Sequence, residues 1–351
     1  MNKKKIVIGL SDGVDSAVAA YLLKEKGWEV HGVYLDIAGE KEKQDAMGSA
    51  EKLGIELTIA EIRQEREQGV CAPFAEGYRR GMTLNPCVLC NPRVKIPALM
   101  RCMGEIGAER IATGHYVRTD GRHLYKGSKD NDQSYMFSRL SREQAERLVL
   151  PLGEMNKTEV RSIAENIDLT VSVKPDSREN CFIPKDMYYA DWLEAHYEMP
   201  GPGPVYFGER QIGVHGGIHR YTVGMRWTED VDGRRVYVTG IEPEHNILRT
   251  DLWENTFTNR VRLGDLHWIE PPESDCFQAS VRVRHTRWEE PACRVNILRG
   301  AGGSVTGAVL ETDSPLRAPA PGQAAALYRG DMLLGGGIVL PFDEKQAASD
   351  R

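Results

Sequence analysis

The hydrophobic and polar positions of the first 200 residues indicate an alternation of strands and helices. The apolar run at 5–10 predicts a buried strand, the helical periodicity of 16–26 predicts a helix, and the run at 28–35 predicts a second strand. The further elements expected in this half are helix 43–53, strand 55–62, helix 93–106, strand 109–113, helical segments up to about residue 147 and helix 156–166. This order predicts an α/β fold with a doubly wound parallel sheet, in which ligands bind beyond the carboxyl ends of the strands.

A different pattern begins at the Pro-Gly run of 200–204, which predicts a stiff linker. Short strands separated by Gly-rich turns are expected after it, at 205–213, 218–224, 235–241, 247–250, 278–284, 291–298, 305–312, 323–328 and 332–339. Such all-β texture is typical of small barrels. The limits that we expect are 1–198 for the α/β domain, 199–260 for a small central β-rich domain, 261–343 for a C-terminal β-barrel and 344–351 for a polar tail.

The composition of the chain indicates where in the cell the protein works and which partners it could bind. No apolar stretch follows Met1, and no run approaches the length of a membrane-spanning helix, so we expect neither a signal peptide nor a membrane partner. The seven cysteines are an odd number in a long chain, which favours the cytoplasm and a catalytic or metal-binding use over a disulfide framework. Because the net charge is −6, a nucleic acid would have to be held by local basic patches.

A phosphate-binding loop is the first candidate for chemistry. The segment 11–16, Ser-Asp-Gly-Val-Asp-Ser, lies between the first expected strand and helix, where backbone N–H groups at a helix N-terminus can face phosphate oxygens. Ser11 and Ser16 could add hydroxyl donors, and Asp15 could help to hold Mg²⁺. The alternative is a plain helix start, because Ser and Asp are common N-caps. The Gly-Lys-Ser/Thr of a Walker loop is absent.

Three cysteines form the second candidate. Cys87 and Cys90, in Asn-Pro-Cys-Val-Leu-Cys-Asn, precede an expected helix, whose N-terminus would lower a thiol pKa. Cys181 lies in a polar loop with Lys174 and Arg178 nearby. A CxxC pair can be half of a zinc site, but no second half follows. The other cysteines stand in apolar or strand contexts and are expected to be ordinary buried residues: Cys71, Cys102, Cys276 and Cys293.

The order of these motifs carries a resemblance over nearly the whole chain. The loop at 11–16 resembles that of the pyrophosphate-releasing ATPases. The collinear motifs SDGVDS, NPCVLCN, ATGHYVR, KDNDQSYMF, LPLGEMNKTEVR, DSRENCFI, PGPV, YTVGMR and PGQAAALYRGDMLLGGGIV are similar to those of the tRNA-specific 2-thiouridylases. The resemblance implies an adenine nucleotide alpha hydrolase-like domain, a central domain and a β-barrel. It also implies that ATP adenylates O2 of the wobble uridine and that a cysteine persulfide supplies sulfur.

The resemblance also implies roles for residues. Cys181 would carry the persulfide, Cys90 would assist release or form a disulfide with it, and Asp15 would complete the catalytic set. The implied ATP site comprises Gly9, Leu10, Ser11, Asp12, Gly13, Val14, Asp15, Ser16, Leu35 and Gly114. The implied tRNA contacts are His115, Asn131, Asp132, Gln133, Arg284, His285 and Gln323. ATP and Mg²⁺ are the expected cofactors. The expected partners are tRNA and a sulfur donor, either a cysteine desulfurase or a sulfur relay protein.

Departures from the family pattern leave alternatives open. Asp12 replaces a glycine, Asn131 replaces a lysine, and 224–229 lacks a lysine, so a paralogous sulfur transferase acting on a non-tRNA substrate remains an alternative. Many relatives have Asp at the position of Cys87, so Cys87, Cys90 and Cys181 could instead ligate an iron–sulfur cluster with one open iron. A non-enzymatic tRNA-binding protein is disfavoured because the loop and cysteines are retained.

A tRNA-binding surface is expected to join three parts of the chain. It would comprise the turn at 127–133, the central domain, and the barrel face that carries Arg282, Arg284 and Arg287. A solvated strand face is the alternative for these arginines.

Overall fold

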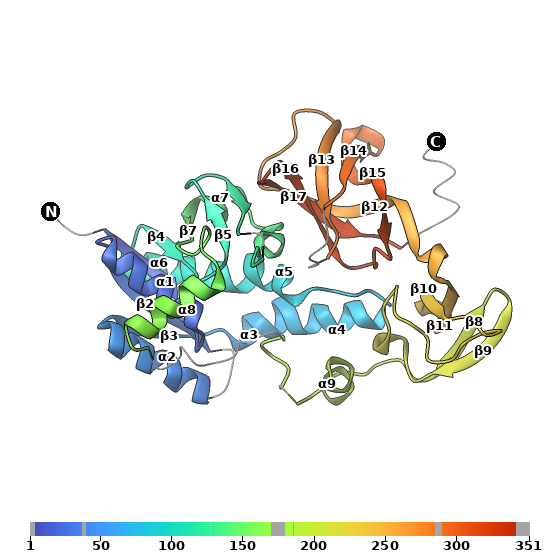
Figure 1. Ribbon diagram of the computed structural model, residues 1–351, viewed down its shortest axis with the longest axis horizontal. Helices are drawn as coiled ribbons and strands as arrows, with labels where there is room; N and C mark the ends of the chain where they lie inside the picture. Colours follow the sequence, from blue (N-terminus) through green and yellow to red (C-terminus); the bar gives the residue numbers. More distant parts are fainter. Residues whose placement is uncertain are drawn as a thin grey trace.

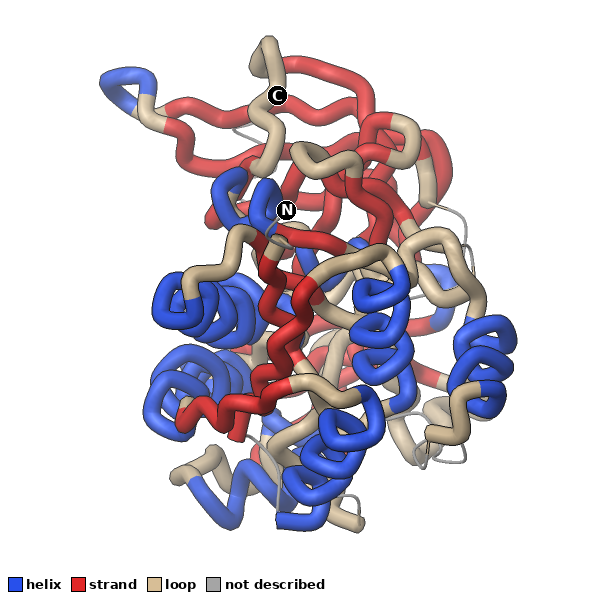
Figure 2. Tube along the Cα trace, turned by 90° about the vertical axis from the view of Figure 1, so that its left-hand side faces the viewer, coloured by secondary structure: helices blue, strands red, loops and turns tan. Residues whose placement is uncertain are grey.

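The computed structural model describes residues 4–36, 40–128, 130–169, 180–184, 186–284 and 290–341. These residues form three sheets, with the α/β part on the left of Figure 1, the central sheet at the lower right and the barrel above it. The view in Figure 2 shows helices on both sides of the parallel strands. Within the described residues, no helix is both long and apolar enough to span a membrane.

The N-terminal sheet confirms the expected doubly wound architecture. Its five strands run parallel in the order β3-β2-β1-β4-β7, with bounds β1 Lys5–Gly9, β2 Glu29–Asp36, β3 Glu56–Glu61, β4 Arg110–Ala112 and β7 Leu148–Val149. Side chains of β1 alternate between two cores: Ile6 and Ile8 pack towards helices α1 (Val14–Glu25) and α8 (Lys157–Asn166), and Val7 packs towards α6 (Ile96–Ile106). Because β1 lies between β2 and β4, the chain leaves it at the topological switch point of the sheet.

The helical region between β3 and β4 contains two π-helices that were not expected. It comprises α3 (Arg63–Arg66), η1 (Glu67–Cys71), α4 (Ala72–Arg79), α5 (Pro86–Cys90), η2 (Asn91–Lys95) and α6, whereas only helix 93–106 was predicted. The two π-helices are in contact, and a Cβ on Gly69 would lie 2.9 Å from Cγ2 of Val94. Helix α2 (Glu40–Leu53) precedes β3. π-Helices often occur at functional sites.

The central sheet has the order β10-β11-β8-β9, and helix α9 (Tyr189–His196) precedes it. Its strands are β8 Gly203–Phe207, β9 Arg210–His215, β10 Val236–Glu242 and β11 Ile247–Leu252. The strand expected at 218–224 is wrong. The chain forms the 3₁₀ turn η5 (Ile218–Arg220) there, because Gly217, with φ of 142°, turns it out of the sheet. Two further 3₁₀ turns are η6 (Pro243–His245) and η7 (Trp253–Thr256).

The barrel is confirmed and closes through pairing of its first and last strands. Its strands are β12 Phe257–Trp268, β13 Cys276–Arg282, β14 Ala292–Arg299, β15 Val305–Arg317, β16 Ala324–Arg329 and β17 Met332–Val339, with the 3₁₀ turn η8 (Ala301–Gly303) between β14 and β15. Strand β12 was not predicted, although it pairs with both β15 and β17. Closure removes the exposed sheet edges that would otherwise invite aggregation.

A hairpin from the α/β part extends the barrel sheet. Strands β5 (Val117–Thr119) and β6 (Leu124–Lys126) pair with each other, and Tyr125 pairs with Met332 of β17. The helical segments expected up to about residue 147 are therefore only partly present. Only η3 (Ser134–Phe137) and α7 (Arg142–Arg147) are helical between β4 and β7, because Gly121, with φ of 90°, turns the hairpin. Tyr328 and Leu333 of the barrel share a core with residues of the α/β part, so the two parts are packed together.

Candidate functional site

The loop between β1 and α1 holds its shape through its own serines. The Ser11 N–H donates to Oγ of Ser16 at 3.0 Å, the Gly13 N–H donates to Oγ of Ser11 at 3.2 Å, and Ser16 Oγ lies 3.1 Å from the carbonyl oxygen of Gly13. Gly13 is the N-cap of α1 and has no side chain, so no side chain of the N-cap covers the first N–H groups of the helix. Asp12 is half-buried in the same loop. The loop therefore presents backbone donors to a ligand at the sheet edge.

Residues from neighbouring strands surround this loop. Leu10 and Val14 are buried in the core on one side of the sheet, and Leu35, near the end of β2 and 9% exposed, packs in the core on the other side. A Cβ on Gly114, which follows β4, would lie 2.7 Å from the backbone carbon of Asp15 and 2.7 Å from the backbone nitrogen of Ser16. Only glycine permits this approach. The residues expected at the ATP site, including Gly9, are thus brought together at the carboxyl edge of the sheet.

Asp15 has partners that the sequence analysis did not identify. Both of its carboxylate oxygens accept from Nζ of Lys157, at 2.7 and 2.6 Å, and Oδ1 also accepts from the Tyr116 hydroxyl at 2.7 Å. The Lys157 ammonium lies 5.6 Å from the centre of the Tyr116 ring. Lys157 comes from the segment LPLGEMNKTEVR, so its presence among the family-like motifs was the signal that could have identified it. An ammonium group at this position suits the binding of phosphate.

Cys87 and Cys90 lie on the short helix α5, which Asn85 caps. The Asn85 side chain accepts from the N–H groups of Cys87 at 2.9 Å and of Val88 at 3.4 Å. The expectation that the helix N-terminus lowers the thiol pKa is wrong for Cys87, because burial is the larger effect and raises its pKa. Cys90 is buried, and all seven cysteines are free thiols.

The structure brings Cys181 close to these cysteines. Although part of Cys181 is exposed, the protein around its thiol raises the pKa to about 11. Cys90 and Cys87 raise this pKa further, which places all three thiols within electrostatic range of one another. A reactive low pKa is therefore not built into the resting thiol. Lys174 and Arg178 lie outside the described residues.

Lys95 is a second residue of this neighbourhood that was not predicted from the sequence. It ends η2, lowers the pKa of the Cys87 and Cys181 thiols, and also lowers the pKa of His115. Lys95 follows Cys90 by five positions and is the last residue of η2. The side chain is half-buried. Lys95 is therefore within electrostatic range of both the cysteines and the turn that follows β4.

Cys71, expected to be an ordinary buried residue, also belongs to this neighbourhood. Burial raises its pKa to about 11, Cys90 contributes to the rise, and Arg66 lowers it. No group of three His, Cys, Asp or Glu side chains within the described ranges is arranged to hold a metal ion. As placed here, Cys87, Cys90 and Cys181 are close neighbours that do not form a ligand set for an iron–sulfur cluster.

Within the described part of the chain, the expected tRNA-contacting residues lie around the junction of the α/β part and the barrel. His115 Nδ1 lies 2.8 Å from Oγ1 of Thr113 and its ring packs edge-on against Phe137; burial and Lys95 depress its pKa well below the usual range. Gln133 Oε1 accepts from the Tyr116 N–H at 3.0 Å, and Gln323 Nε2 donates to the Thr83 carbonyl at 2.8 Å.

Asn131 and Arg284 also lie near this junction. The Asn131 N–H donates to the Ser128 carbonyl at 3.0 Å, and its side chain is half-buried. Arg284 Nη2 donates to the carbonyl oxygens of Arg317, at 3.1 Å, and Ala318. Asp132 is 6% exposed and bonded within the protein. His285 and Arg287 lie outside the described residues. The tRNA contacts of this group stay predictions.

The Lys95→Gln substitution is expected to slow alkylation of Cys181 by iodoacetamide. Loss of the cation raises the thiol pKa. Each unit of rise cuts the thiolate fraction about tenfold, and the greater nucleophilicity of the more basic thiolate restores about threefold, so a net slowing of about threefold per unit follows. Because the Cys181 pKa is already about 11, the rate should rise with pH without a plateau below that value. Peptide mass spectrometry measures the rate at each cysteine.

Two controls accompany this measurement. Arg93→Gln removes a cation from the same π-helix, at an exposed position, and should leave the Cys181 rate unchanged. The exposed Cys276 on the barrel serves as an internal reference. Equal slowing in both variants, or no slowing in Lys95→Gln, would contradict the role of Lys95.

Comparison with known proteins agrees with this geometry. A family model described as the tRNA methyl transferase HUP domain matches residues 4–185, and one described as the aminomethyltransferase beta-barrel domain matches residues 258–339. The chain is 35% identical to the tRNA-specific 2-thiouridylase MnmA of Chlorobium luteolum, over 96% of each chain. It is 36% identical to that of Pelobacter propionicus, over 95% of this chain and 97% of the relative, and 37% identical to that of Syntrophotalea carbinolica, over 96% and 98%.

Proposed function

This chain belongs to the tRNA-specific 2-thiouridylase family, and from this premise we propose that it is an ATP-dependent tRNA 2-thiouridylase. Its substrate would be the wobble uridine of tRNA, whose O2 is adenylated and then replaced by sulfur. The similarity to these tRNA-specific relatives extends over nearly the full length of the chain and therefore includes the central sheet and the barrel. This supports tRNA, and not a small molecule, as the substrate.

One observation carries the proposal. His115, which directly follows Gly114, packs edge-on against Phe137 of η3, and η3 contacts helix α5, which carries Cys87 and Cys90. Gly114 in turn packs against the backbone of the phosphate loop. The thiols and the expected ATP site, which are far apart in the sequence, therefore adjoin in the fold. An adenylated carbonyl formed at the loop would lie near the sulfur that attacks it, as sequential activation and substitution require.

The loop and Lys157 would act in the first step. O2 of the uridine attacks the α-phosphorus of ATP, and the bond to the bridging oxygen breaks, so pyrophosphate leaves. Backbone N–H groups at the start of α1 and the Lys157 ammonium would stabilise the negative charge on the phosphates. Mg²⁺ accompanying the nucleotide would neutralise part of the charge on the departing pyrophosphate.

The cysteines would act in the second step. The terminal sulfur of a persulfide on Cys181 attacks C2, and AMP leaves with the former O2. The Cys90 thiolate then attacks Sγ of Cys181, so the persulfide S–S bond breaks, its sulfur stays on C2, and a Cys90–Cys181 disulfide forms. An external thiol must reduce that disulfide, and Lys95 would stabilise the anionic persulfide before attack.

The exposure of Cys181 suits loading by a second protein. A cysteine desulfurase or a sulfur relay protein must bring its own persulfide into contact with the receiving thiol, and Cys181 is the exposed member of the cluster, whereas Cys90 and Cys71 are buried. We place this reaction in the cytoplasm, where thiols stay reduced between turnovers.

The test is nucleoside mass spectrometry of tRNA from a strain that lacks this gene. We expect the 2-thiouridine derivatives to disappear and to return when the wild-type gene is restored. The purified protein with ATP, a sulfur donor and unmodified tRNA should restore the modification and release AMP and pyrophosphate in equal amounts. Unchanged 2-thiouridine in the deletion strain, with no thiolation by the purified protein, would refute the proposal.

A further inference from the structure

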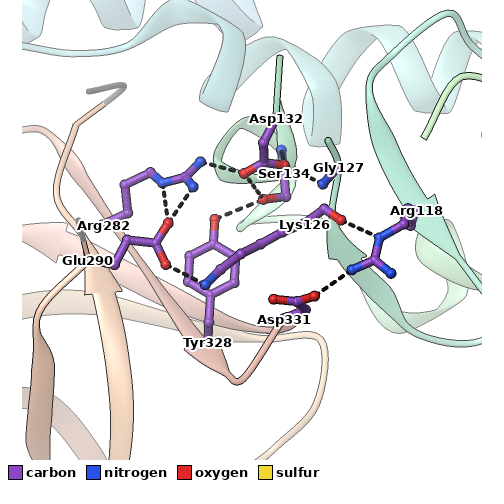
Figure 3. A network of polar contacts seen from close by, with 9 residues as sticks. All are labelled: Arg118, Lys126, Gly127, Asp132, Ser134, Arg282, Glu290, Tyr328 and Asp331. Atoms are coloured by element: carbon purple, nitrogen blue, oxygen red, sulfur yellow. Dashed lines mark hydrogen bonds and ion pairs between the residues drawn. The ribbon is translucent and has the colours of Figure 1, made fainter. Parts of the chain in front are cut away.

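A charge network joins the α/β part to the barrel (Figure 3). Asp132 Oδ2 accepts from Nη1 of Arg282 at 2.6 Å, and Arg282 Nε donates to Oε1 of Glu290 at 2.6 Å. The Lys126 ammonium lies 2.5 Å from Oε2 of Glu290. Asp132 and Lys126 come from the α/β part, and Arg282 and Glu290 come from the barrel. Two positive and two negative groups therefore form one balanced set across the junction.

The network is largely withdrawn from solvent. The side chains of Arg282 and Glu290 are 13% and 10% exposed, and Asp132 is 6% exposed. The Tyr328 ring lies beneath both cations, 5.5 Å from the Arg282 guanidinium and 4.6 Å from the Lys126 ammonium. Its hydroxyl meets Oγ of Ser134 at 3.0 Å. Removal of one charge from such a set leaves another charge buried without a partner, which costs far more than loss of an exposed pair.

The α/β side of the network is anchored independently of the barrel. Asp132 Oδ1 accepts from the N–H groups of Gly127 at 2.7 Å and Ser134 at 3.0 Å, which closes the turn on itself. Gln133 and Tyr116 exchange hydrogen bonds, the Gln133 N–H donating to the Tyr116 carbonyl at 3.0 Å. Gly127 and the segment 130–134 are therefore fixed to the ATP-binding half, and Oδ2 of Asp132 faces the barrel.

On the barrel side, the network includes the last residue of β13 and a residue that shortly precedes β14. Arg282 is the last residue of β13, and Glu290 lies two residues before β14 begins at Ala292. Arg284, an expected tRNA contact, follows Arg282 by two positions. Fixing the Arg282 guanidinium thus fixes where the end of β13 presents Arg284 relative to the ATP-binding half.

We propose that the Asp132–Arg282–Glu290–Lys126 network is a positioning device that sets the tRNA-binding edge of the barrel against the ATP-binding half. Asp132 is then a positioning residue that acts through Arg282 and does not itself bind tRNA. This inference rests on the proposed function for its link to tRNA, and on the contacts above for the link between the two parts.

The test compares Asp132→Asn with Asp331→Asn. Asparagine keeps the Oδ1 acceptor for the turn but removes the charge that pairs with Arg282. We expect the KM for tRNA to rise about tenfold, within the usual range for coupled members of one network, with kcat at saturating tRNA and the affinity for ATP unchanged. Asp331 pairs with Arg118 across the same junction at 2.6 Å, but the pair is exposed, so Asp331→Asn should have little effect.

Two further measurements separate positioning from tRNA contact. Arg282→Gln should raise the KM for tRNA like Asp132→Asn, and the double variant should be no worse than the more affected single variant. In Asp132→Asn, Arg282→Gln and the double variant, the slope of tRNA affinity against salt concentration should equal that of the wild type, because no phosphate contact is lost. Additive effects or a reduced slope would overturn the proposal in favour of direct contacts.

Hydrogen exchange tests the positioning without tRNA. In Asp132→Asn, amides near the end of β13 and the start of β14 should exchange faster, while α1 and the segment 130–134 stay as in the wild type. Unchanged exchange at the barrel, or faster exchange throughout with lost ATP binding, would refute a positioning role. If the wild-type protein binds no tRNA, the proposed function fails, and the exchange result still decides whether the network sets the barrel.

Discussion

Replacing Cys181 by serine is expected to abolish sulfur transfer while ATP-dependent adenylation continues. A serine hydroxyl cannot carry a transferable sulfur atom, whereas the phosphate loop and Lys157 are not altered by the change. We expect thiolation in a single turnover to fall by at least about three orders of magnitude, as removal of a covalent nucleophile commonly does. Radiolabelled pyrophosphate exchange measures adenylation, and nucleoside mass spectrometry of the product tRNA measures transfer.

Cys276→Ser is the matched control for this substitution. Cys276 is also exposed, but it lies at the start of β13 in the barrel, and we expect full activity from that variant. The assignment of Cys181 as the sulfur carrier is wrong if Cys181→Ser keeps the wild-type extent of single-turnover transfer. If Cys181→Ser also loses pyrophosphate exchange, the substitution has damaged the ATP site.

Replacing Gly114 by alanine is expected to raise the KM for ATP at least tenfold. The added Cβ would lie 2.7 Å from backbone atoms of Asp15 and Ser16, so either the turn after β4 or the start of α1 must move. A shift there misaligns the N–H groups that would face the phosphates, and a tenfold loss corresponds to only about 1.4 kcal/mol of binding free energy. Steady-state kinetics at saturating tRNA gives the KM.

Gly104→Ala is the matched control for the added methyl group. Gly104 lies within α6, and its Cβ would meet nothing within 4 Å, so the change should leave ATP use intact. It should raise the free energy of unfolding by about 0.5–1 kcal/mol, because alanine favours a helix more than glycine does. An unaltered KM for ATP in Gly114→Ala would show that ATP phosphates do not bind at this loop.

The predictions from sequence succeeded where the signal is local. The uninterrupted apolar run of Ile6, Val7 and Ile8 predicts a buried strand, and in the structure these side chains pack into cores on both faces of β1. They failed where a short element depends on distant partners. The hairpin β5–β6 has three-residue strands, and β6 joins the barrel sheet through β17, more than 200 positions later in the chain.

The residues of the candidate site also fall into two groups, those predicted from the sequence and those found only in the structure. The cysteine motif, the loop and Gly114 are visible in the sequence, but the pairing of Asp15 with Lys157 joins segments far apart in the chain. The pKa of Cys181 illustrates the limit most clearly. A polar sequence and nearby cations suggested a reactive thiol, yet the surrounding protein raises the pKa to about 11. Desolvation depends on atoms from several segments, so a sequence window does not report it.

The sequence by itself indicated the alternation of strands and helices in the α/β part and the positions of the 11–16 loop and of the cysteine motif, because periodicity and motif spacing are properties of neighbouring residues. The tertiary structure decided which charged side chains are free to meet a substrate. From the sequence, Asp132 is an expected tRNA contact and Arg282 is part of an expected tRNA-binding surface, but the fold buries them against each other across the junction with the barrel. The charge of a side chain follows from its residue type, whereas its burial depends on packing between segments that are far apart in the sequence.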